Sequence, residues 1–198
     1  MPSSLPSVED LADYLRVVET AVDDYDVLDG VRLYTQSLIR KVTGRTWTVA
    51  SGSASTRVYA PRAVGQDLIR IHDCVTVTSV TNDGVTVPAW TTAGGYQLEP
   101  LNGLDWAGET RPYEGIRYIG NAWTFDRFRA TVAVTADWGW AALPDQVVRT
   151  HYVLAKDVWE FRSQQGNAGM DEFLENKAKM LLKGYRREEA KAGIGGPR

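Results

Sequence analysis

Residues Ala136 to Val147 read ADWGWAALPDQV, and this stretch decides the fold. The residues that lead into it alternate between apolar and polar types, which is typical of a β-strand. The residues that follow begin with Pro144 and Asp145. Proline suits the first turn of a helix because no N–H is needed there, and an acid favours the positive end of the helix dipole. The stretch therefore predicts the point at which a β region ends and a helix begins.

Two tryptophans, Trp138 and Trp140, flank Gly139 at this junction. Burying a tryptophan removes about 150–250 Å² from water, so such residues are costly to leave without a packing partner. We hypothesise that Trp138 and Trp140, together with Trp159 on the helix that follows, pack the β region onto the helices.

Helical patterns flank the β region on both sides. Ser7 and Asp10 resemble a capping box at the start of a helix from about Val8 to Val18. A second helix is predicted from the acids near Asp23 to Gly44, which can adopt the left-handed stop. After the junction, we predict a third helix from Pro144 and a fourth from about Asp171.

Between Arg45 and Trp138 the apolar pattern changes from helical to alternating. Asp83-Gly84 predicts a tight hairpin turn with positive φ angles. The segment from Ala93 to Arg111 is rich in Gly, Asn and Asp and is predicted to be an exposed excursion. The predicted β-rich runs are TWTVA, TRVYA, DLIRIHD, CVTVTSV, VTVPAW, GYQLE, GIRYIG, AWTF and FRATVAVTADWG.

These patterns predict an α+β fold, a small four-helix bundle with a large antiparallel β insertion between helices 2 and 3. The predicted domains are residues 1–44 for the N-terminal helices, 45–140 for the β-rich insertion, and 141–198 for the C-terminal helices and tail. The first and last segments are expected to belong to the same bundle.

The chain has 198 residues and a net charge of -3, which disfavours tight electrostatic binding to nucleic acid. Its single cysteine, Cys74, and the lack of a signal-like start favour synthesis in a cytoplasm, and no apolar run suits a membrane span. Eight acids lie between Glu9 and Asp29, whereas residues 176–187 carry only basic charges. These charges form either solvated helix faces or complementary docking faces.

The sequence predicts no enzyme, no cofactor and no metal site. His72, Asp73 and Cys74 are adjacent, but alternation on a strand would place His72 and Cys74 on one side and Asp73 on the other. No second His or Cys cluster completes a metal site. His151 lies among apolar helix positions, so we expect a half-buried structural histidine. We find no phosphate-binding glycine loop and no nucleophile elbow.

Most of the tryptophans lie in or beside the β region. They favour core packing, and the alternative is an aromatic platform for sugar or nucleobases. A carbohydrate-binding module would use exposed rings such as Trp90 and Trp106.

The order of these features resembles the head-to-tail adaptor (connector) proteins of long-tailed bacteriophages. The resemblance covers most of the chain and includes LIRKVTGRTW, the passage TVAVTADWGWAALPDQVVRTHYVLAKDVWEFR, and the end LLKGYRR. It implies a structural virion protein without catalysis. Such proteins form a ring, usually of twelve copies, between the portal and the stopper or tail, and they extend the DNA channel.

The resemblance also implies partners and a location. The partners are the portal protein, a stopper or tail-completion protein, other copies of the chain, and double-stranded DNA that passes through the lumen without sequence-specific binding. The expected location is the head-tail junction of the virion, after synthesis in the bacterial host cytoplasm, and no membrane is involved. By position, the candidate portal contacts are Leu181, Leu182, Tyr185, Arg186 and Arg187. A stopper or tail-completion protein is the alternative within the same class.

Overall fold

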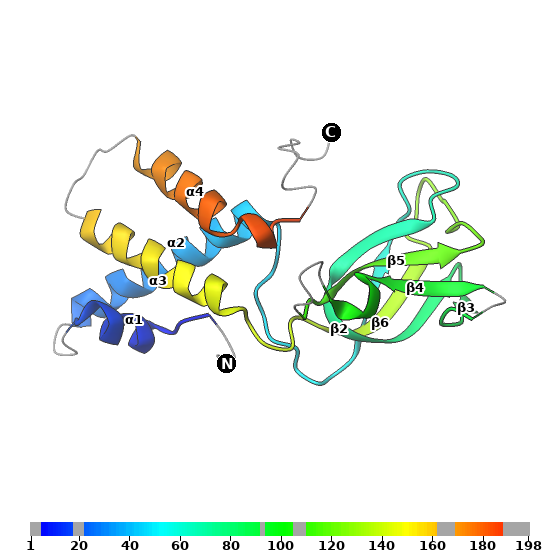
Figure 1. Ribbon diagram of the computed structural model, residues 1–198, viewed down its shortest axis with the longest axis horizontal. Helices are drawn as coiled ribbons and strands as arrows, with labels where there is room; N and C mark the ends of the chain where they lie inside the picture. Colours follow the sequence, from blue (N-terminus) through cyan, green and yellow to red (C-terminus); the bar gives the residue numbers. More distant parts are fainter. Residues whose placement is uncertain (1–4, 18–21, 92–93, 105–109, 162–168, 188–198) are drawn as a thin grey trace. The chain divides into compact units, whose positions relative to one another are not determined.

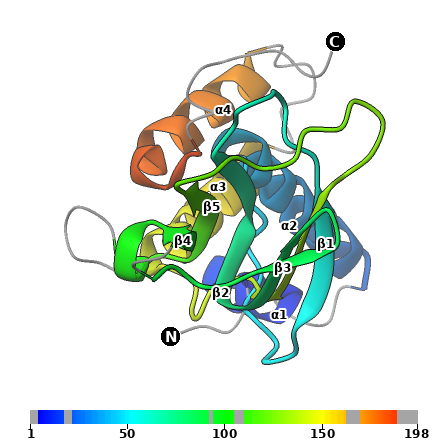
Figure 2. The same cartoon turned by 90° about the vertical axis from the view of Figure 1, so that its right-hand side faces the viewer.

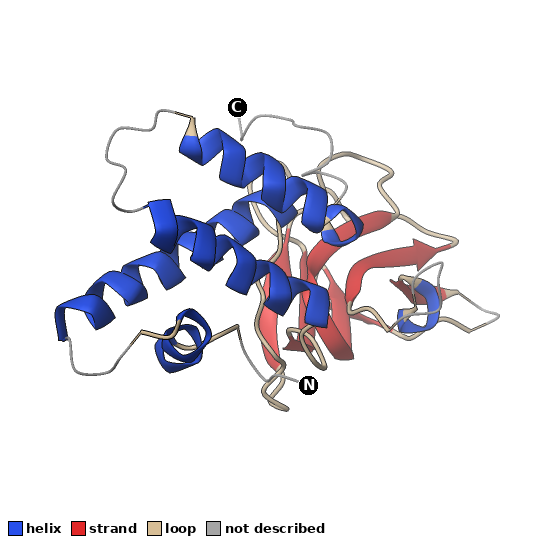
Figure 3. Ribbon diagram, turned by 60° about the vertical axis from the view of Figure 1, so that its left-hand side comes forward, coloured by secondary structure: helices blue, strands red, loops and turns tan. Residues whose placement is uncertain are grey.

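The computed structural model describes residues 5–17, 22–91, 94–104, 110–161 and 169–187. Contacts divide the chain into two compact units, one formed by residues 1–48 with 142–198 and the other by residues 49–141. In the described residues the first unit is helical and the second contains the strands (Figure 3).

The α+β class is correct, but the predicted small four-helix bundle with a β insertion is wrong. Residues 49–141 form a compact unit with a six-stranded antiparallel sheet and a hydrophobic core of its own. The physical reason is the number of alternating apolar residues in this region, which is large enough to bury a separate core.

The helical unit begins with α1 (Val8–Leu15), which starts and stops as its sequence requires. The hydroxyl of Ser7 accepts from the N–H of Asp10 at 3.1 Å, and a carboxylate oxygen of Asp10 accepts from the N–H of Ser7 at 2.8 Å, which confirms the capping box. Arg16 adopts a left-handed conformation with φ 56° and ends the helix earlier than predicted. Leu11 and Ala12 are the buried positions of α1.

Two longer helices form the centre of this unit, α2 (Val22–Thr43) and α3 (Asp145–Phe161), which pack against each other (Figure 1). Gly44 follows α2 with φ 66° and donates its N–H to Arg40, as predicted for a C-terminal stop. The last helix, α4 (Met170–Leu181), packs on both of them and is followed by a 3-10 turn, η2 (Lys183–Tyr185).

The sheet has the strand order β1-β6-β2-β5-β4, with β3 paired to the far end of β2 (Figure 2). In the described residues all strand pairs are antiparallel. The strands are β1 (Ser55–Tyr59), β2 (Leu68–Asn82), β3 (Val85–Val87), β4 (Gly95–Glu99), β5 (Tyr113–Ile119) and β6 (Val132–Trp138).

Alternation in β6 builds the centre of the core, because Val132, Val134, Ala136 and Trp138 are buried and the residues between them are less so. Two predicted strands, DLIRIHD and CVTVTSV, are one strand, β2, which spans 15 residues. The AWTF run is not a strand, and TWTVA contributes only an isolated bridge at Val49.

The backbone of the sheet unit requires glycine at two positions, Gly84 in a turn and Gly95 at a close backbone contact. Asp83 and Gly84 have φ angles of 52° and 82°, which confirms the predicted hairpin turn between β2 and β3. Gly95 has φ 133°, and a Cβ there would lie 2.6 Å from the carbonyl oxygen of Pro88. The predicted exposed excursion after Ala93 is therefore partly wrong, since it contains β4 and the buried Tyr96. Within it, a 3-10 turn, η1 (Leu101–Gly103), follows β4, and residues 105–109 lie outside the described part.

Candidate interaction site

The C-terminal segment, defined as Leu181–Arg187, contains all the candidate portal contacts. Leu182 is fully buried in the helical unit, so its side chain acts as core. The ring of Tyr185 packs edge-on against Trp47, with centroids 6.0 Å apart and planes at 72°. Leu181, Arg186 and Arg187 are partly exposed.

Three residues just after and at the end of α2 hold this segment. The guanidinium Nε of Arg45 donates to the carbonyl oxygen of Tyr185 at 2.7 Å. The N–H of Arg187 donates to the carbonyl oxygen of Thr43 at 2.9 Å. The hydroxyl of Thr43 also accepts from Trp47 Nε1 at 3.1 Å and donates to Ile39 at 2.7 Å.

The sequence alone predicts no role for Thr43, Arg45 or Trp47. All three lie in the LIRKVTGRTW run, which is part of the resemblance to head-tail connectors. The sequence does not show, however, which residues these three contact. The structure brings this run and the LLKGYRR run together. The role of the C-terminal segment in portal binding stays a prediction.

Charged and polar pairs attach α4 to its neighbours. Glu175 accepts from Lys41 on α2 at 2.5 Å and from Lys179 at 2.6 Å. The hydrogen bond from Lys179 is the largest cause, followed by that from Lys41, and together they lower the pKa of Glu175 to about 2. Lys177 pairs with Asp157 on α3 at 2.6 Å, and the hydroxyl of Tyr34 on α2 donates to Asp171 at 2.6 Å.

His151 joins α3 to α2 inside the helical unit. It is fully buried, in contrast to the half-buried position predicted, and its Nε2 lies 3.0 Å from Thr35 Oγ1 and 3.4 Å from the carbonyl oxygen of Arg32. Its Nδ1 is buried, and no hydrogen-bond partner for it lies among the described residues. Burial lowers the pKa of His151 to about 4, so the imidazole is neutral at physiological pH.

Trp138 and Trp140 make polar contacts within the sheet unit. Trp138 donates from Nε1 to the carbonyl oxygen of Ser55 at 2.8 Å, and the Arg57 guanidinium lies 4.5 Å from its ring centroid. Trp140 donates from Nε1 to Asp73 at 3.2 Å. Trp159 packs partly buried on the core of the helical unit. The predicted role of these three residues in joining the β region to the helices stays a prediction.

The neighbours His72, Asp73 and Cys74 do not form a site. Register shifts in the pairing of β2 with β5 and β6 break the expected alternation, so Asp73 and Cys74 are both buried and His72 is exposed. His72 Nδ1 lies 2.8 Å from the hydroxyl of Tyr59, and burial raises the pKa of the Cys74 thiol to about 12. Among the described residues, no group of three or more His, Cys, Asp or Glu is placed to hold a metal ion.

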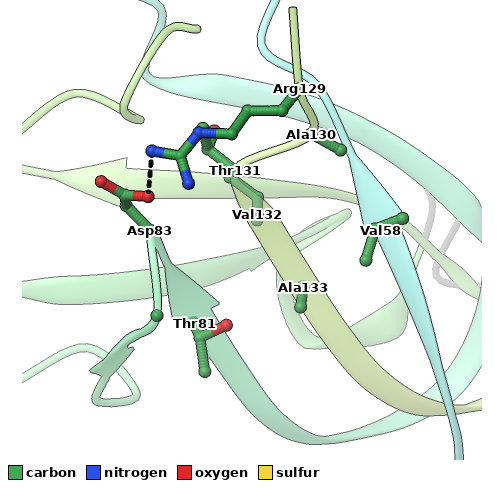
Figure 4. A pocket seen from close by; sticks show the side chains of 9 residues that line it. Val58, Thr81, Asp83, Arg129, Ala130, Thr131, Val132 and Ala133 are labelled. Atoms are coloured by element: carbon green, nitrogen blue, oxygen red, sulfur yellow. Dashed lines mark ion pairs between the residues drawn. The ribbon is translucent and has the colours of Figure 1, made fainter.

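A pocket of about 330 Å³ opens on the sheet unit beside the start of β6 (Figure 4). The guanidinium of Arg129 lies across it and pairs with Asp83 at 2.8 Å. Its other lining residues are small or aliphatic, namely Val58, Thr81, Gly84, Ala130, Thr131, Val132 and Ala133. This lining offers no nucleophile paired with a base.

The aromatic platform is weakly supported, since Trp123 and Trp140 are buried in the core. Trp90 is 53% exposed, and Trp106 lies outside the described residues. Among the described tryptophans of the sheet unit, this single exposed ring is less than the row of rings on which sugars stack.

The fold is shared with neck proteins of phage-like particles. The chain superposes on the neck of an empty gene transfer agent particle computed with C6 symmetry, with TM-score 0.55, 20% identity, and coverage of 100% of this chain and 95% of the other. It also superposes on the neck of a native particle computed with C12 symmetry, with TM-score 0.53, 16% identity, and coverage of 100% and 99%. The resemblance to head-tail connectors is thereby confirmed at the level of the fold. No family model and no curated protein matches the chain.

No helix in the described part of the chain is both long and apolar enough to cross a membrane.

Proposed function

We propose that this chain is a structural protein of a virion neck, an adaptor that forms a ring between the portal and the stopper or tail and extends the DNA channel. The observation that supports it is the fold match, which covers this chain and nearly all of each neck protein. The proposal is also consistent with a site made of packing contacts rather than of catalytic groups.

The proposed assembly is a ring of twelve copies. The two neck structures carry C6 and C12 symmetry, which describes those particles. A cyclic ring requires heterologous interfaces, in which one face of a subunit meets a different face of its neighbour.

The proposed portal contact is the exposed part of the C-terminal segment. Leu182 is buried and Tyr185 packs on Trp47, so these two residues position the segment. The proposed portal contacts within it are the side chains of Arg186 and Arg187, which are partly exposed.

The proposed lumen allows DNA to pass without holding it. Strong phosphate contacts would release counterions and bind the duplex tightly. A net charge of -3 is suited to a channel that does not retain the genome. The chain would be made in the host cytoplasm and would act in the virion.

The first test is light scattering coupled to size exclusion, on the chain alone and after mixing with the portal ring of the same particle. A portal complex that contains about twelve copies of this chain supports the proposal. A chain that binds only after another protein has bound the portal is a stopper, and a chain that never associates contradicts both roles.

A matched pair of variants tests the docking residues. The double variant Arg186→Glu with Arg187→Glu should abolish portal binding. The hydrogen bond from the backbone N–H of residue 187 to the carbonyl oxygen of Thr43 does not depend on the side chain and should persist. Arg149→Glu, an exposed reversal on α3, is the control and should bind normally. Equal binding by both variants would place the portal contact elsewhere.

A further inference from the structure

The outward side of α2 is exposed and contains a glycine at its centre. The α2 outer face is defined as Asp26, Gly30, Leu33, Ser37 and Arg40, which recur every three or four residues and are all exposed. It lies opposite the buried stripe of the same helix, which includes Leu28, Val31, Thr35, Leu38 and Ile39.

Gly30 is not required by the fold of its own chain. It lies inside α2, where glycine is a poorer helix former than alanine, and a Cβ added there would meet nothing within 4 Å. Its neighbours one turn away include Val27, which is 46% exposed, and Leu33, which is 52% exposed. A glycine surrounded by larger exposed side chains leaves a hole on the helix surface into which a side chain of another helix fits.

The outward side of α4 carries side chains of the opposite shape. The α4 outer face is defined as Glu172, Phe173, Asn176 and Met180 on α4 together with Lys183, the first residue of the following turn η2, and all five residues are exposed. Met180, at 70% exposure, and Phe173, at 51%, are its large apolar members. The face lies opposite the buried Leu174, Ala178 and Leu182.

The two faces also match in charge when they run antiparallel. With Met180 placed over Gly30, Lys183 lies beside Asp26, and Glu172 lies towards Arg40. At about 1.5 Å per residue, Asp26 and Arg40 are about 21 Å apart along α2, and Glu172 and Lys183 are about 17 Å apart along the α4 outer face. The long side chain of Arg40 spans the difference. Within the described part of the chain none of these four charged residues forms an ion pair, so each is available to another copy.

We infer that the α2 outer face of one copy packs antiparallel on the α4 outer face of the next copy, with Met180 seated over Gly30. The contact is heterologous, because the two faces differ, and it can therefore be repeated around a ring. The inference rests on the proposed adaptor ring and specifies which surfaces build it.

Cysteine cross-linking of the full chain tests the contact directly. Neither new cysteine disturbs the fold, because Gly30 has free space around it and Met180 is mostly exposed. Under mild oxidation at high protein concentration, Gly30→Cys with Met180→Cys should give a ladder of covalent oligomers. A mixture of the two single variants should stop at dimers, and each single variant alone should stay monomeric on a denaturing gel.

Two controls show whether a cross-link is specific to the proposed contact. Wild type retains the buried Cys74 and should not cross-link. Gly30→Cys with Val64→Cys pairs the same site with an exposed residue outside the proposed face and should give no ladder. Cross-linking by Gly30→Cys alone would mean that two α2 helices meet, which overturns the inference.

A charge exchange provides an independent test. Asp26→Lys and Lys183→Asp should each weaken self-association roughly two- to fivefold, the usual range for an exposed ion pair, and the double variant should restore it. Failure of the double variant to restore association overturns the inference.

The failures of the inference and of the proposed function are distinguishable. If wild type forms rings on the portal while the cysteine pair gives no ladder, the proposed function stands and the inferred contact is wrong. If wild type shows no oligomer alone or with the portal, both are wrong.

Discussion

The backbone N–H of Arg187 donates to the carbonyl oxygen of Thr43 at 2.9 Å, so the last described residue is fastened to the C-terminal end of α2. Tyr185, two residues earlier, is held by Arg45 and Trp47. The C-terminal segment therefore stabilises the helical unit, whatever else it contacts.

Two truncations separate the structural contribution of this segment from that of the residues beyond it. Deleting residues 184–198 removes the Tyr185 and Arg187 contacts and should lower stability by about 2 kcal/mol, or Tm by roughly 5 °C. Deleting residues 188–198 keeps those contacts and is the reference against which the longer deletion is compared. Differential scanning calorimetry measures both, and equal Tm values would show that the contacts contribute nothing.

Gly30 provides a substitution with opposite effects on folding and on assembly. Gly30→Ala should raise the unfolding free energy by up to about 1 kcal/mol, because alanine favours the helix. The added methyl group fills the hole on the α2 outer face and should weaken self-association. Urea unfolding and light scattering measure the two effects, and a variant that assembles better than wild type would contradict the proposed packing.

His151 predicts a pH dependence of stability in the acid range. Its pKa is about 4 in the folded chain, against a reference value of 6.5. The unfolded chain therefore binds more protons between these pH values than the folded chain does. The contribution of His151 to stability is fully present above pH 6.5 and is lost as the pH falls towards 4. The loss over this window is on the order of 3 kcal/mol.

The matched variants for this prediction are His151→Gln and His72→Gln. The first should flatten the dependence of unfolding free energy on pH between 4 and 6.5, even if it also lowers the plateau. His72→Gln replaces the exposed histidine of the chain and shows whether a change in slope is specific to the buried one. An unchanged slope in His151→Gln would assign the acid sensitivity to other groups. Glu175 is not one of them, because its pKa of about 2 places its own loss of stability below this pH range.

Trp140 donates a hydrogen bond from its buried indole to the buried carboxylate of Asp73. Trp140→Phe removes this donor together with part of the buried ring, and the lost donor alone should cost about 1–3 kcal/mol. Trp90→Phe, at a largely exposed position, is the control and should cost little. Chemical unfolding of both variants measures the difference, and equal stability would show that the bond to Asp73 is dispensable.

Local signals in the sequence predicted the local structure well. The capping box at Ser7, the turn at Asp83-Gly84 and the helix after Pro144 each depend on a few adjacent residues. The bulged pairing of β2 could not be predicted in the same way, because it depends on the strands beside it.

The site was harder to predict than the fold, because burial separates residues that are adjacent in the sequence. Leu181 and Leu182 were grouped as candidate contacts, yet Leu182 is core and Leu181 is only partly buried. Gly30 carried no signal in the sequence, because an exposed glycine in a helix gains meaning only when the space around it is known.

The start and the end of the sheet unit meet in space. Val49 and Trp140 form a parallel bridge, and the N–H of Ala50 donates to the carbonyl oxygen of Trp140 at 2.9 Å. Because its two ends are already held together by its own hydrogen bonds, the segment does not depend on the flanking residues to bring them together. Residues 49–141 are therefore suited to expression as an independent polypeptide, in which the sheet can be studied without the helices.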